Sequence, residues 1–110
     1  RPEKNSLEMI RPGDKRADLC HAALDQSPVR QDGAVFVFSG VPQRTTVKYG
    51  QRAVRYVYIE VGHAAQNLLL QAKAQALGSV VVGAFRDDEV SKVLGLPADT
   101  QPLTLMPVGR

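Results

Sequence analysis

Apolar residues at steps of three and four dominate the middle of the chain, from about residue 52 to residue 77. The positions that follow this period are Val54, Val57, Tyr58, Val61, Ala65, Leu68, Leu69, Ala72 and Ala76. The period predicts a helix of roughly 25 residues, with Gly78 as its stop. Ile59, Ala64 and Leu70 add apolar surface elsewhere on the cylinder. We therefore expect this helix at the buried centre of the fold or in a subunit interface.

Shorter patterns flank the long helix. Residues 14–25 predict an amphipathic helix capped by Asp14 and stopped by Ser27-Pro28. The continuous apolar run 34–38 predicts a strand buried on both faces and ended by Val41-Pro42. Further elements are expected as a short buried strand at 79–82, a helix from Asp87 or Asp88 to about Leu94-Gly95, and a last strand at 103–108.

Residues 1–13 mix charges with two prolines and show no sustained period, which predicts an irregular arm on which Leu7, Met9 and Ile10 could dock. The remaining chain is long enough for one domain with one core. No apolar run could span a bilayer, and the single cysteine, Cys20, is compatible with a reducing cytosol, so we expect a cytoplasmic protein without membrane contact.

The formal net charge of +3 is too small to indicate nucleic acid, although it suits a local anion site. Four cations, Arg44, Lys48, Arg52 and Arg55, would form a basic stripe on a helix that continued through Gly50. An anionic cofactor or peptide could use this stripe, but a solvated helix face is the simpler interpretation of the same four residues. The stripe lacks aromatic residues interleaved for base stacking, so we expect no nucleic-acid partner.

The order of strand, long helix, strand, helix and strand suggests a nucleotide-binding βαβ unit, but the glycines argue against it. Leu77-Gly78-Ser79 lies between helix and strand, where no phosphate loop would be, and neither GxGxxG nor a Walker sequence occurs. His63 has no partner at metal-ligand spacing, so a packing or capping role is favoured and no metal site is expected.

Several ordered motifs resemble one family. They are RTTVKYGQRAVRYVYIEVGHAAQNLLLQA, ALGSVVVGAF, DDEV with VLGLP, and PLTLMPVGR. Together they resemble the C-terminal half of the nitroreductase-like flavoproteins, specifically the SagB-type dehydrogenase branch, over about residues 19–110. The resemblance implies FMN as cofactor and homodimers with flavin sites at the subunit interface. It also implies an α+β fold with a central, mainly antiparallel sheet packed with a long buried helix, of which this chain would be one part in a single domain, 1–110.

In that family, the segment matching Val82, Gly83, Ala84 and Phe85 runs beside the isoalloxazine ring. Fixed backbone N–H donors there stabilise the negative charge that hydride transfer leaves on a flavin. Glycine permits a close approach because it has no side chain. From the residues alone, the favoured interpretation is that Gly83 merely ends a strand.

Lys48-Tyr49 matches an adjacent pair in the azoline-oxidising relatives, which act on modified peptides. Oxidation sends a hydride to FMN and a proton to a base, and a lysine acting as that base must be partly desolvated. The alternative is a solvated lysine and a packing tyrosine before a helix. The pair does not distinguish a modified peptide from a small-molecule substrate.

Residues 1–18 contain no counterpart of the Arg-Ser-rich segment with which the family grips the FMN phosphate. Two functions therefore remain open. One is an FMN-dependent oxidoreductase that transfers hydride between flavin and an organic substrate. The other is a truncated, flavin-free module for dimerisation or scaffolding.

Overall fold

A three-stranded antiparallel sheet lies at the centre of the computed structural model, which describes residues 2–110. The strands are β1 (Ala34–Gly40), β2 (Gly78–Ser79) and β3 (Gln101–Gly109), in the order β1-β3-β2. β1 pairs with β3 from Ala34 opposite Val108 to Gly40 opposite Gln101, with an irregularity after Phe38. An isolated bridge between Val82 and Leu105 continues the β2 edge. The predicted last strand is confirmed, and it occupies the middle of the sheet.

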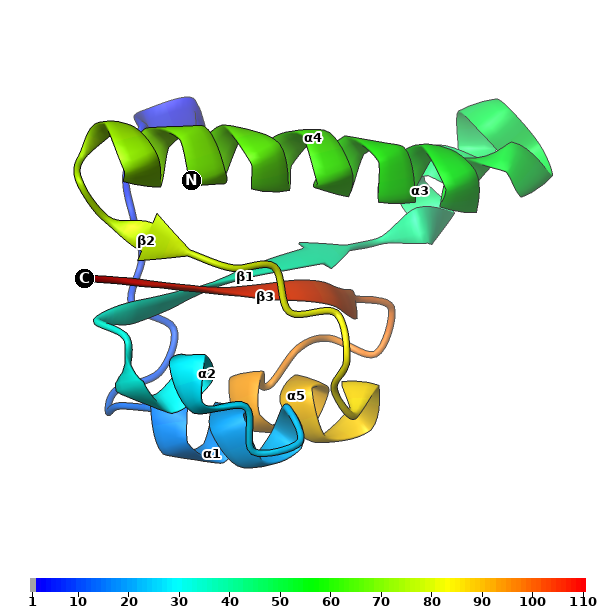
Figure 1. Ribbon diagram of the computed structural model, residues 1–110. Helices are drawn as coiled ribbons and strands as arrows, with labels where there is room; N and C mark the ends of the chain where they lie inside the picture. Colours follow the sequence, from blue (N-terminus) through cyan, green and yellow to red (C-terminus); the bar gives the residue numbers. More distant parts are fainter. Residues whose placement is uncertain (1) are drawn as a thin grey trace.

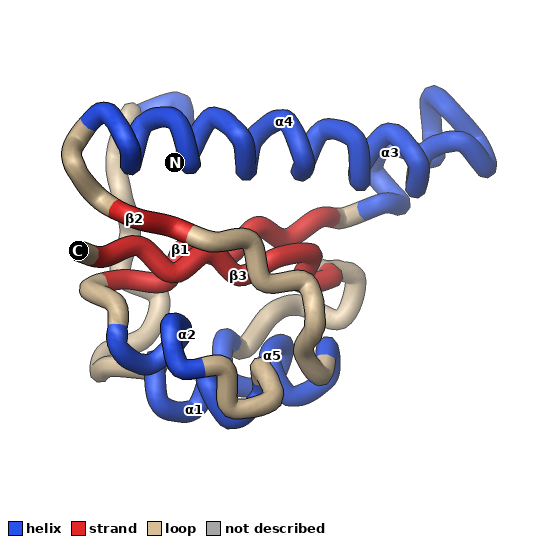
Figure 2. Tube along the Cα trace, viewed as in Figure 1, coloured by secondary structure: helices blue, strands red, loops and turns tan. Residues whose placement is uncertain are grey.

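Helices cover both faces of the sheet (Figures 1 and 2). The long helix α4 (Ala53–Ala74) lies along one face, and α1 (Arg16–Ala22), α2 (Ser27–Gln31) and α5 (Asp87–Leu94) lie on the other. Two short 3-10 helices, η1 (Pro2–Lys4) and η2 (Gly50–Arg52), and the helix α3 (Pro42–Tyr49) complete the described elements. The α+β architecture with an antiparallel sheet and a long helix is confirmed.

The main core lies between the sheet and the layer of shorter helices. Its members are Leu19, Cys20, Ala22, Ala23, Val29, Val82, Val90 and Leu105. Val29, Val90 and Leu105 are fully buried, and each such side chain contributes about 1.5–3 kcal/mol of burial free energy. This core fixes the loop that leaves the sheet at Val82.

Two strand predictions need correction. β1 is not buried on both faces, because it is an edge strand within the described residues and Phe36 is 51% exposed. The strand expected at 79–82 is shorter and less buried than predicted, since β2 ends at Ser79 and Val80 and Val81 are exposed.

The end of α4 also differs from the prediction. The backbone N–H of Leu77 donates to Ala72 O and that of Ala76 to Lys73 O, while Ala76 adopts the left-handed conformation (φ 56°). These two bonds form a Schellman motif, in which alanine takes the place that glycine usually has. The helix therefore ends before Gly78, which instead begins β2.

Only one face of α4 is buried in this chain. Its buried residues are small, namely Ala53, Val57, Ala65 and Ala72. Ile59 and Leu70 lie about three turns apart on the opposite face and are exposed. Burial at the centre of the fold is thus found for one face of the helix, and a subunit interface on the other face stays a prediction.

The N-terminal region departs from the prediction in two places. α1 ends at Ala22, because Leu24 and Asp25 both take left-handed conformations, and Ser27-Pro28 begins α2 instead of stopping α1. The described part of the arm, residues 2–13, is irregular apart from η1, and the apolar side chains Leu7, Met9 and Ile10 are exposed. Arg1 lies outside the described residues.

α3 was not predicted, and it changes the interpretation of the basic stripe. Gly50 ends α3 with a φ of 54°, and η2 separates it from α4. The helix is therefore not continuous through Gly50, so the four cations do not share one helical face. No helix within residues 2–110 is long and apolar enough to cross a membrane.

Candidate functional site

The segment 82–85 leaves the sheet at a firmly held residue. Val82 and Leu105 exchange two backbone hydrogen bonds of 2.9 Å, and the Thr104 hydroxyl donates to Val82 O at 3.0 Å. Val82 is 4% exposed. The start of the segment is thus fixed by the central strand.

The next residues turn outward but are also held from behind. Gln26 Nε2 donates to Ala84 O at 2.8 Å, and the Arg86 backbone N–H donates to Ala22 O at 2.9 Å. The half-buried Phe85 packs against the core. Both ends of the loop are therefore tied to the layer of shorter helices.

The outer side of this loop has open hydrogen-bond donors. Within residues 2–110, the backbone N–H groups of Gly83, Ala84 and Phe85 have no hydrogen-bond acceptor. A Cβ built on Gly83 would meet nothing within 4 Å. The result is a rigid backbone segment with free donors and room for another group to approach.

Lys48 and Tyr49 lie in the last turn of α3. The Lys48 ammonium stands 5.2 Å from the centroid of the Tyr49 ring, and the Tyr49 and Tyr56 rings meet edge to face with centroids 5.0 Å apart. The three side chains form one cation and aromatic cluster. Because Lys48 and Tyr49 are both exposed, this chain alone does not provide the desolvation that a catalytic lysine requires.

A cavity of about 340 Å³ adjoins the cluster. Its lining residues are Thr45, Tyr49, Tyr56, Ile59, Glu60 and His63. Sequence reasoning missed Tyr56 and Glu60, because α3 was not predicted and its packing against α4 brings these residues beside Tyr49. No group of three or more His, Cys, Asp or Glu residues in the described chain could hold a metal ion.

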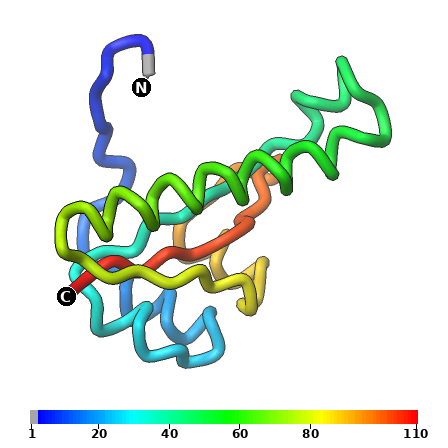
Figure 3. The backbone as a smooth tube through the Cα atoms, turned by 45° about the horizontal axis from the view of Figure 1, so that its top comes forward, coloured from blue at the N-terminus to red at the C-terminus, as the bar shows by residue number. Residues whose placement is uncertain are grey.

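The two predicted site segments do not meet within one copy of the chain. None of the described cavities is lined by both, and Figures 1 and 3 show α3 at the far end of α4, beyond the sheet. Residues 82–85 follow β2 instead, toward α5. The assignment of both segments to one site stays a prediction.

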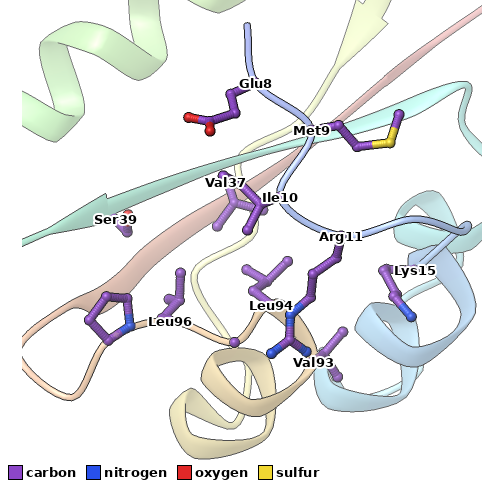
Figure 4. A pocket seen from close by; sticks show the side chains of 12 residues that line it. Glu8, Met9, Ile10, Arg11, Lys15, Val37, Ser39, Val93, Leu94 and Leu96 are labelled. Atoms are coloured by element: carbon purple, nitrogen blue, oxygen red, sulfur yellow. The ribbon is translucent and has the colours of Figure 1, made fainter. Parts of the chain in front are cut away.

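Another cavity lies between the N-terminal arm and α5. It has a volume of about 680 Å³, and Figure 4 shows Ile10 and Arg11 of the arm facing Val37 of β1 and Leu94 of α5. Arg11 lies against the backbone of Gly95, which has a φ of 63° and ends α5. A cation there complements the negative end of the helix dipole, which is a structural role.

Known proteins match this architecture over nearly the whole chain. The model of the nitroreductase family matches residues 2–110. The chain is 42% identical over 109 residues to a protein named "Putative nitroreductase MJ1384" from Methanocaldococcus jannaschii, covering 99% of this chain and 54% of that protein. The fold and the family match define the class: the chain belongs to the nitroreductase family.

Solved structures agree with that assignment. The structure of a putative nitroreductase from Anabaena variabilis superimposes with a TM-score of 0.86 at 33% identity, covering 93% of this chain and 21% of the other. The NADPH:FMN oxidoreductase of Vibrio harveyi, solved with NAD⁺, gives a TM-score of 0.76 at 28% identity, with coverages of 92% and 48%. The chain thus spans about half the length, or less, of these relatives.

Proposed function

We propose that this chain forms the C-terminal part of an FMN-dependent oxidoreductase of the SagB type, which transfers hydride between flavin and an organic substrate. The family match and the name of the Vibrio harveyi relative support a redox function of this kind. The observation that carries the proposal is the row of unbonded N–H groups at residues 83–85.

These residues fit the ring of a flavin. When bound, FMN supplies the atom that accepts or returns the hydride. The amides of Gly83, Ala84 and Phe85 would donate to the ring edge, where fixed dipoles stabilise developing negative charge without reorganising. Gly83 leaves room for the ring, and the bonds to Gln26 and Arg86 hold the donors in place.

The second half of the site would come from another copy of the chain. We propose a homodimer in which Lys48 and Tyr49 of one copy face residues 82–85 of the other. The separation of the two segments within one copy supports this arrangement, as does the exposed apolar residue Leu70 on the free face of α4. Contact with a partner would also desolvate Lys48.

The proposed substrate class is an azoline ring in a modified peptide. Oxidation to the aromatic azole removes a hydride, which passes to FMN, and a proton, which Lys48 would accept. Lys48 would accept the proton as its neutral amine, and the Tyr49 ring would orient that side chain, since Lys48 Nζ already lies over it. The grip on the FMN phosphate would come from chain outside these 110 residues.

The experiment is an absorbance spectrum of the protein purified at its natural length, with and without added FMN. We expect a yellow protein that retains about one FMN for each subunit through gel filtration. A colourless protein that does not bind added FMN would contradict the proposal and favour the flavin-free scaffold instead.

A further inference from the structure

The hairpin of α3, η2 and the start of α4 extends beyond the end of the sheet (Figures 1 and 3). We call residues 42–59 the α3–α4 corner. All charged residues of this corner are basic, namely Arg44, Lys48, Arg52 and Arg55. No Asp or Glu occurs between Asp32 and Glu60. All four cations are exposed, and none forms an ion pair within the described residues.

Apolar side chains are exposed on the same corner. Val47 is 91% exposed, Tyr58 55% and Ile59 48%. An open hollow of about 510 Å³ is lined by Val54, Arg55, Tyr58 and Ile59. Exposed Arg and Tyr beside aliphatic groups are the residue types that dominate binding energy at protein interfaces.

We propose that the α3–α4 corner binds an acidic peptide segment that also carries apolar side chains. Carboxylates of the segment would pair with Arg44, Arg52 and Arg55, and its apolar side chains would cover Val47, Val54 and Ile59. The segment would arrive beside Lys48-Tyr49. The inference that it belongs to the peptide substrate therefore rests on the proposed function, whereas binding itself requires no flavin.

Other ligands fit the corner less well. A small anion needs several cations that converge on one point, but the four corner cations are distributed over α3, η2 and α4. Of these four cations, Arg55 alone lines either of the two cavities described at the corner. A second copy meeting corner to corner would oppose like charges. Nucleic acid would stack on aromatic faces, and the corner exposes Tyr49 and Tyr58, but the three exposed aliphatic side chains beside them suit apolar peptide side chains better than bases.

The test is fluorescence anisotropy with a labelled synthetic peptide of alternating Glu and Leu, added to the protein at its natural length in low salt. Parallel titrations use a Lys-Leu peptide, a Glu-Ser peptide and a single-stranded oligonucleotide. We expect the Glu-Leu peptide to bind tightest and its affinity to fall as salt is added.

Two triple variants locate the binding. Arg44→Gln/Arg52→Gln/Arg55→Gln removes three corner charges, and Arg30→Gln/Lys73→Gln/Lys92→Gln removes three exposed charges elsewhere. We expect the corner variant to lose about tenfold in affinity and the control less than about twofold. Urea unfolding of both variants verifies that they are folded.

Three results would overturn the proposal. The first is an absence of Glu-Leu binding at low salt, and the second is an equal loss of affinity in both triple variants. The third is tighter binding of the oligonucleotide, which would assign the corner to nucleic acid. Flavin content is measured separately, so a protein that binds FMN but not the peptide refutes only this inference.

Discussion

Arg16 connects three parts of the N-terminal region through one guanidinium group. Its Nε and Nη2 donate to the Asp14 carboxylate at 2.6–3.0 Å, and its Nη1 donates to the backbone oxygen of Asp32 at 2.6 Å. The Asp14 carboxylate also accepts from the Arg16 backbone N–H at the start of α1. The N-cap residue is Lys15, which makes no side-chain capping bond, so Asp14 binds the first N–H of α1 from one residue before the cap position that was predicted for it.

These bonds predict a pH dependence of stability. The hydrogen bonds from Arg16 lower the pKa of Asp14 from 3.8 to about 2. A carboxyl group with a lowered pKa in the folded state stabilises the fold above its unfolded pKa, and this contribution is lost as the pH falls to about 2. We expect Asp14→Asn to lower the urea midpoint at pH 7 and to match the original protein near pH 2.

Asp18→Asn is the control, because it removes the same charge from an exposed residue of α1 for which no ion pair is found in the described chain. It should have a smaller effect at pH 7. A difference between Asp14→Asn and the original protein that stayed constant down to pH 2 would refute the role of Arg16.

At the scale of elements, local signals explain what the sequence could predict. α5 begins with three acidic residues and ends at Gly95 in a left-handed conformation, so both of its ends could be predicted from the sequence. The end of α4 could not be predicted in this way, because Ala76 adopts the left-handed conformation that glycine favours. α3 was not predicted because it is short and largely exposed where it packs on α4, so its sequence has no sustained apolar period.

The packing of α4 makes a prediction of its own. Small residues on its buried face let it approach the sheet, and Ala65 is only 5% exposed. We expect Ala65→Leu to overpack this contact and to lower the free energy of unfolding by about 1–3 kcal/mol, measured by urea denaturation.

Ala74→Leu adds the same side chain at an exposed position of α4. Its effect should stay within about 0.5 kcal/mol. Equal effects of the two variants would show that α4 does not pack closely on the sheet.

At the scale of the whole molecule, the candidate site is divided. The family motifs predict both of its segments, but the sequence could not show their separation, which depends on the protrusion of α3 beyond the sheet. It also could not show that Gln26, far away in sequence, holds the Ala84 carbonyl. Such long-range contacts arise from packing and not from local pattern.

The proposed homodimer predicts an effect at Leu70, which is 60% exposed on the free face of α4. We expect Leu70→Glu to weaken the dimer about tenfold or more in sedimentation, since a carboxylate would be buried in an apolar contact. Gln75→Glu, at the end of α4, adds the same charge and should leave the dimer intact. A dimer unaffected by Leu70→Glu would place the interface elsewhere.

The most direct test of the central claim is an FMN titration of the natural-length protein and its Gly83→Ala variant, followed by flavin fluorescence. A Cβ at Gly83 has open space within the chain, so the urea midpoint should not change, whereas a flavin ring against the backbone would be pushed away. Gly62→Ala, equally open but on α4, is the control. We predict about tenfold weaker FMN binding for Gly83→Ala alone, and unchanged FMN binding in that variant would contradict the account.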